Sequence, residues 1–164
     1  MANFNEVYLG ISWIVQTLSG DSTMVSLAPG GVFRGKVPST LENSAIVTPL
    51  VIVAHQGGPG DVTNMNGYRL FDNLLFQAVV AGPEGQYTQI AAAAAYLDKL
   101  LGGPPALPAS GPINAPTGSG ATGTPGWVLS CFRQQPILLD LEENGENWVK
   151  FGGLYKIQLQ QNAS

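Results

Sequence analysis

Residues 69–81 form the longest stretch of strand-forming residues in the chain, and this stretch constrains the fold more than any other. Successive side chains of a strand point to opposite faces, so residues two apart share a face. Apolar residues occupy both sets of positions: Leu74, Phe76, Ala78 and Val80 on one face, Leu75 and Val79 on the other. The pattern predicts a long strand over Arg69–Ala81 and a fold organised around a sheet.

Helical periodicity predicts two helices beside this sheet. The segments of about Phe4–Leu18 and Gln86–Leu101 each carry an apolar stripe at helical spacing. A short helical turn is expected at Met24–Leu27. Runs of apolar and β-branched residues predict four further strands, at Val32–Val37, Leu50–His55, Trp127–Leu139 and Trp148–Leu159.

Turn residues indicate how these elements are connected. Asn144-Gly145 is typical of a type I′ hairpin turn, and the glycines at 57–60 predict a turn after the second strand. Gly152-Gly153 predicts a β-bulge in the last strand. A length of 164 residues fits one domain. We therefore expect a single α+β domain over residues 1–164, a mostly antiparallel sheet with two helices packed on it.

Residues 102–126 form a long insert with 7 glycines, 6 prolines and no charged residue. Such a composition predicts an extended loop that lies outside the domain core. The insert contains Gly118-Ser119-Gly120-Ala121-Thr122-Gly123, which matches the spacing of a dinucleotide-binding loop. That function needs a strand before the glycines and a helix after them, and neither is expected here. We interpret the segment as a flexible loop.

The charge content is unusually low. Charged residues make up 11% of the chain, against about 25% in an ordinary soluble domain. A surface so poor in charge is typical of a protein covered by other copies or by other proteins. The net charge of −4 argues against tight nucleic-acid binding, which needs an excess of Lys and Arg. No apolar run reaches 18 residues, so we expect no membrane-spanning helix.

Two residues have side chains that could act in catalysis. His55 ends a predicted strand and Cys131 lies inside another, and neither stands in a motif that supplies a partner nucleophile or base. We interpret His55 as a structural strand-end histidine and Cys131 as a small buried residue. The sequence thus predicts that the protein is not an enzyme, with no catalytic residues, no cofactor and no metal ligands. A single cysteine also fits a particle assembled inside a cell.

The charged residues that remain are candidates for contacts between subunits. Arg34, Arg69 and Arg133 lie on or next to predicted strands and are expected to pair within the sheet or across subunits. Four carboxylates surround the predicted hairpin turn: Asp140, Glu142, Glu143 and Glu146. Either they form a solvated, negatively charged tip, or they bind a divalent cation.

Several different short patterns follow one another in a fixed order along most of the chain. They are the opening helix ending near Leu18, Gly31-Val32-Phe33, Thr48-Pro49-Leu50-Val51-Ile52-Val53, Gly67-Tyr68-Arg69-Leu70, the helix Tyr87–Leu101, Cys131-Phe132-Arg133 and Phe151-Gly152-Gly153-Leu154-Tyr155. In this order and spacing the chain resembles the tail terminator or tail completion proteins of long-tailed bacteriophages, also called minor tail or tail-to-head joining proteins. The insert at 102–126 is longer and richer in Gly and Pro than that family's pattern.

The resemblance implies a structural virion protein that forms a ring, six copies being expected, at the tail and neck. Such a ring caps the tail tube, ends its polymerisation and joins the tail to the head connector, with DNA passing through the lumen without specific binding. The resemblance also implies assembly in the host cytoplasm and contacts with the tail tube protein and the connector. Two alternatives remain open: another tube or neck protein of the same particle, or a small carbohydrate- or receptor-binding domain using Trp13, Trp127 and Trp148.

Overall fold

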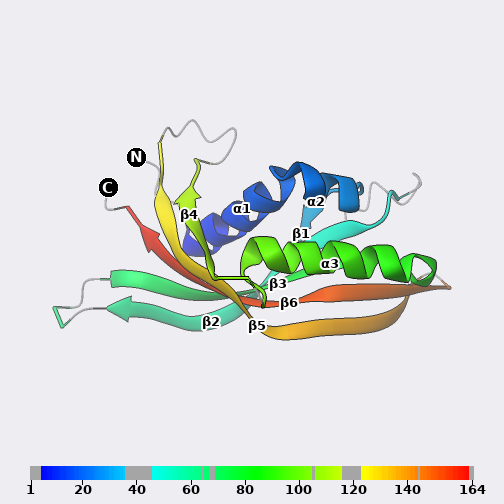
Figure 1. The fold of residues 1–164 in the computed structure, drawn as a ribbon. Coiled ribbons are helices and arrows are strands. Elements are labelled where there is room, and N and C mark those ends of the chain that lie inside the picture. Colours follow the sequence, from blue (N-terminus) through cyan, green and yellow to red (C-terminus); the bar gives the residue numbers. More distant parts are fainter. Residues whose placement is uncertain are drawn as a thin grey trace.

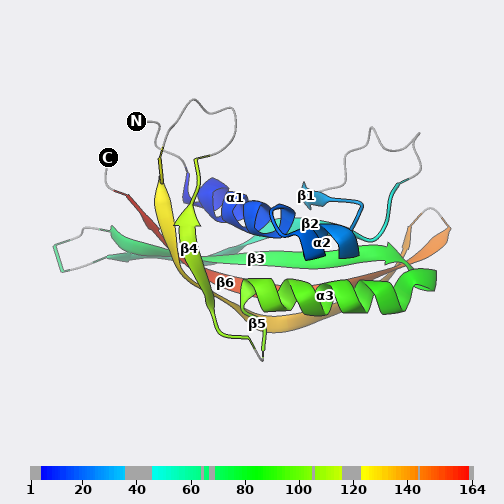
Figure 2. The ribbon, with the colours of Figure 1, turned by 45° about the horizontal axis from the view of Figure 1, so that its top comes forward.

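Figure 1 shows the computed structural model of the chain, in which one twisted, curled sheet carries its helices on a single face. The view in Figure 2 confirms that α1, α2 and α3 lie on the same side of the sheet. The structure describes residues 5–35, 46–63, 65–66, 69–104, 106–115, 123–143 and 145–162.

The sheet has six strands in the order β1-β2-β3-β6-β5-β4. Their bounds are β1 Val32–Arg34, β2 Leu50–Thr63, β3 Arg69–Pro83, β4 Ala109–Ile113, β5 Gly126–Glu143 and β6 Glu146–Gln161. The pair of β1 and β2 is parallel, and the other four pairs are antiparallel. The prediction of an α+β fold with a mostly antiparallel sheet is confirmed.

The helices begin and end close to the predicted positions. They are α1 Glu6–Ser19, α2 Ser22–Leu27, the 3-10 turn η2 Glu84–Gln86 and α3 Tyr87–Leu101. The Asn5 side chain accepts a hydrogen bond from the N–H of Val7 at the start of α1, and Asp21 does the same for Met24 at the start of α2. Three α-helices therefore lie on the sheet, because the turn predicted at Met24–Leu27 extends to six residues.

A single apolar core fills the space between the helices and the sheet. The helix-facing residues of β3 that the alternation predicts, among them Phe76, Ala78 and Val80, are fully buried there. Gly10 of α1 lies directly over Phe76, and a Cβ at Gly10 would come within 2.8 Å of the Phe76 ring. Trp13 is buried in the same core, which removes it from the residues that could stack on a sugar.

Two glycine clusters do not form the structures predicted for them. The cluster at 57–60 lies inside β2 and not in a turn, because Gly57 and Gly60 adopt positive φ and form irregularities that let the strand continue to Thr63. Gly152 and Gly153 form no bulge, since both pair in continuous register with β3. They are needed for close approach: a Cβ at Gly153 would lie 2.6 Å from Cδ of Arg133.

The expectation of an extended loop over 102–126 is wrong for residues 109–113, which form β4 and pair with β5. Ile113 is fully buried in the core, so this part of the insert belongs to the domain. An edge strand tolerates Pro112, because a proline there need not supply a ladder hydrogen bond. Residues 116–122, with most of the glycine-rich motif, lie outside the described residues.

Among the residues that the structure describes, no helix has the length and apolar character needed to cross a bilayer.

Candidate interaction surface

The two residues considered for catalysis lie apart. His55 is exposed within β2, with its ring 5.3 Å from that of Phe76, so it is not at the end of a buried strand. Cys131 is fully buried in β5, and this burial raises the pKa of its thiol well above the usual range. Strands β3 and β6 lie between them, which separates the two backbones by about 14 Å at the usual strand spacing. They cannot act as a nucleophile and base pair.

Arg133 forms its ion pair inside the chain. Its guanidinium contacts the carboxylate of Asp98 on α3, and the hydroxyl of Tyr155 on β6 donates to the same carboxylate. Burial, followed by the hydrogen bond to Asp98, raises the pKa of Tyr155 far above its usual range. This network fastens α3 to the centre of the sheet.

The other two arginines are on different strands. Arg34 is exposed at the end of β1, and its guanidinium lies 5.5 Å from the centre of the Tyr8 ring. Arg69 begins β3, and its side chain lies outside the described residues. The structure thus places the three arginines on β1, β3 and β5 and does not bring them together.

The predicted hairpin is present, and its tip is acidic. Strands β5 and β6 pair up to Glu143 and Glu146, and Gly145 in the turn has a φ of +78°. Asp140, Glu142 and Glu146 are exposed, whereas the side chain of Glu143 lies outside the described residues. No group of three or more His, Cys, Asp or Glu residues in the described part of the chain is placed to hold a metal ion.

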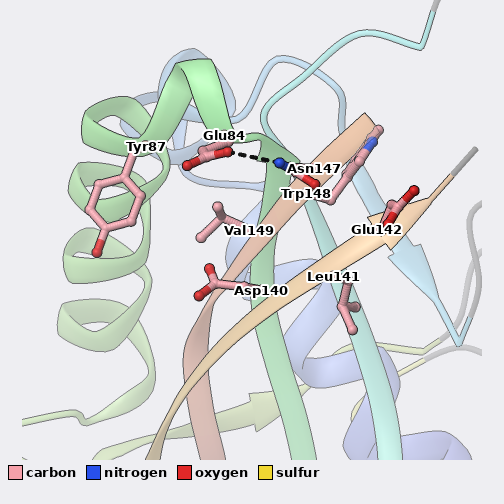
Figure 3. A pocket seen from close by; sticks show the side chains of 8 residues that line it. All are labelled: Glu84, Tyr87, Asp140, Leu141, Glu142, Asn147, Trp148 and Val149. Atoms are coloured by element: carbon pink, nitrogen blue, oxygen red, sulfur yellow. Dashed lines mark hydrogen bonds between the residues drawn. The ribbon is translucent and has the colours of Figure 1, made fainter. Parts of the chain in front are cut away.

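A pocket of about 380 Å³ lies at the base of this hairpin (Figure 3). Its lining comes from the start of α3 and the turn before it, and from both strands of the hairpin: Glu84, Tyr87, Asp140, Leu141, Glu142, Asn147, Trp148 and Val149. The Asn147 side-chain amide donates to Glu84 over 3.2 Å, which ties the hairpin to the turn before α3. Sequence reasoning missed Glu84, which stands in a Pro-Glu-Gly break far from the other carboxylates.

The outer edge of β5 is a second feature that sequence reasoning missed. Strand β4 pairs with β5 only between Gly126 and Cys131, and the N–H of Arg133 then donates to the carbonyl of Gly102. Among the described residues, no backbone group pairs with the outer side of β5 from Gln134 to Glu143. Three leucines on this half of β5 are exposed: Leu138 (54%), Leu139 and Leu141. A long, apolar, unpaired strand edge is a template for pairing with another chain.

Comparison with known proteins gives a likeness of fold. No family model matches the chain, and no curated protein matches it. A solved structure described as the virion of a native gene transfer agent (GTA) particle contains a chain that superposes with a TM-score of 0.61. The match covers 90% of this chain and 91% of that chain at 12% sequence identity. At this identity the two chains share the fold.

Proposed function

We propose that this chain is a structural protein of a phage-like virion. The observation that carries the proposal is the fold, which matches a chain of a gene transfer agent virion over almost the full length of both. The low charge content gives independent support, since 18 charged residues in 164 leave much of the surface suited to burial against other subunits.

Within such a particle, the proposed role is that of a tail terminator. In this role the chain forms a ring, expected to have six copies, that caps the tail tube, ends its polymerisation and joins the tail to the head connector. It contacts the tail tube protein and the connector, and DNA passes through the lumen without specific binding. Two features support this role: the order of the short sequence patterns, which resembles that of tail terminator proteins, and the unpaired strand edge on β5, which suits a contact between copies.

We further propose that the protein performs no catalysis. The separation of His55 from Cys131 supports this, as does the burial of the Cys131 thiol, which keeps it protonated at neutral pH. The proposed location is the tail and neck of the virion, after assembly in the host cytoplasm.

Light scattering of the purified protein, followed by negative-stain imaging, tests the proposal. We expect closed rings of six copies that do not stack. Open stacks of rings would favour a tail tube or connector subunit of the same particle. A stable monomer that binds sugars would overturn the structural role in favour of a carbohydrate-binding domain.

A further inference from the structure

Within the described part of the chain, two strand edges are unpaired at the same end of the sheet. At the hairpin end, β1 is the outermost strand on one side, and the second half of β5 is the outermost strand on the other. In Figure 1 the hairpin of β5 and β6 extends away from β4, which reaches only the opposite end of β5. A subunit with two different open edges can join neighbours in a head-to-tail manner, which is the contact that closes a ring.

One row of apolar residues crosses the sheet between these two edges. The registers of the strand pairs align Val32 of β1 with Val51, Val80 and Phe151, and finally with Leu138 of β5. Val51 and Val80 in the middle of the row are fully buried. The two ends are not, since Val32 is half-buried and Leu138 is 54% exposed. The apolar row is therefore fully covered in its middle and only partly covered at its two ends.

The space beside Leu138 suits a neighbouring side chain. A groove of about 390 Å³ runs between α3 and β5, and its helix side consists of Asp98 and three alanines, Ala91, Ala94 and Ala95. The small alanine side chains leave room that an added strand would fill with its own helix-facing residues. Leu138 and Ile137 line the strand side of the same groove.

The directions and charges of the two edges also fit each other. Strand β1 is parallel to β2, and three successive antiparallel pairings lead from β2 to β5, so β1 and β5 run in opposite directions. A neighbour that continues the sheet with its helices on the same side would thus pair β1 against β5 in the antiparallel manner.

The β1 edge ends in exposed Arg34, whereas the β5 edge carries exposed Asp140 and Glu142. Opposite charges on the two edges favour this contact over the pairing of two β5 edges.

We infer that the β5 edge of one copy pairs with the β1 edge of the next, so that the six-stranded sheet continues from subunit to subunit. The occupant of the groove beside Leu138 is then the β1 strand of a second copy of this chain. This inference rests on the ring of the proposed function and specifies the surface on which that ring closes.

Engineered disulfides test the inference on the full chain. Within one subunit, Val32 and Leu138 are four strand spacings apart, or about 19 Å, which no disulfide can bridge. The double variant Val32→Cys with Leu138→Cys can therefore link only different copies. Arg34→Cys with Leu138→Cys and Arg34→Cys with Asp140→Cys probe the two next registers, each shifted by two residues. Native Cys131 is retained, because it is fully buried in β5.

We expect at least one double variant to give a ladder of covalent oligomers up to the ring size on oxidation, and each single variant to remain unlinked. Efficient dimers from Leu138→Cys alone would overturn the inference, because two β5 edges would then be paired with each other. Rings seen by light scattering without linkage in any double variant would overturn it and leave the proposed ring intact. Monomers in the parent protein would instead overturn the ring itself, and the edge contact with it.

Discussion

The network of Asp98, Tyr155 and Arg133 allows a sharp test of what holds α3 on the sheet. Tyr155 is fully buried and donates its hydroxyl to Asp98, so the two substitutions Tyr155→Phe and Asp98→Ala remove opposite halves of one hydrogen bond. Tyr155→Phe removes the donor and leaves Asp98 paired with Arg133. Asp98→Ala leaves a buried hydroxyl without a partner.

The structure sets the expected magnitudes. A hydrogen bond to a charged group contributes about 1.5–3 kcal/mol, so Tyr155→Phe should lower the free energy of unfolding by about 2 kcal/mol. Asp98→Ala adds the desolvation cost of the orphaned hydroxyl and should lower it by about 2–4 kcal/mol. Loss of the ion pair adds less than about 1 kcal/mol, because the Arg133 side chain is 21% exposed and can reach water. The double variant has no orphaned hydroxyl and should be no less stable than Asp98→Ala alone.

Urea unfolding followed by tryptophan fluorescence measures these values, with all variants compared at one protein concentration and in the same oligomeric state by light scattering. The expected coupling energy between the two positions is about 1.5 kcal/mol or more. In a chain of this length, Tyr155→Phe should also lower Tm by about 4–8 °C. Strictly additive losses, or a change below about 0.5 kcal/mol for Tyr155→Phe, would refute the role assigned to this network.

Three further predictions concern stability. Gly152→Ala forces a Cβ into the backbone of β3 and should cost about 1–3 kcal/mol in unfolding free energy, whereas the control Gly85→Ala has nothing within 4 Å of its Cβ and should be neutral. The native thiol of Cys131 should resist a thiol reagent until urea unfolds the protein. Because folding raises the pKa of this thiol, the free energy of unfolding should fall as the pH rises above 9.0, the ordinary pKa of a cysteine, and Cys131→Ala should lessen that fall. Asp140, Glu142 and Glu146 are all exposed near the hairpin tip, so Glu146→Gln lessens the repulsion between like charges there. It should raise the unfolding free energy by about 0.2–0.5 kcal/mol in low salt and by less in 1 M salt.

The sequence predicted correctly those helices and turns that depend on short patterns of neighbouring residues. Helical periodicity placed α3 at Gln86–Leu101 against the observed Tyr87–Leu101, and Asn144-Gly145 placed the hairpin turn correctly. The same reasoning missed β4, because a segment rich in Gly and Pro has low strand propensity and pairs here only through contact with β5. The sequence also predicted an end of β2 at His55, but irregular pairing with β3 extends this strand past Gly57 and Gly60 to Thr63.

The surroundings of the candidate site depend on contacts that no local pattern contains. Arg133 was a candidate for pairing within the sheet or across subunits, yet its partner Asp98 lies on a helix 35 residues earlier in the chain. Asp140 and Glu142 were identified as neighbours, but the turn residue Glu84 that shares their pocket precedes them by more than 50 residues. Which strands end at a sheet edge is likewise a property of the whole pairing order, so the exposed edge of β5 had no signature in the sequence.

The two long edges of the sheet differ in a way that bears on assembly. Natural proteins protect exposed edges with bulges, prolines and charges, because regular edges pair with other chains. Beyond its contact with β1, β2 is interrupted by register shifts around Gly57 and Gly60, so its outer edge is poorly shaped for pairing. The outer half of β5 has no register shift from Gln135 to Glu143, and Pro136 removes one N–H at most. The edge that carries Leu138 therefore has a regular backbone, and its exposed charges, Asp140 and Glu142, lie toward the hairpin tip. A regular edge of this kind is expected where another subunit covers it.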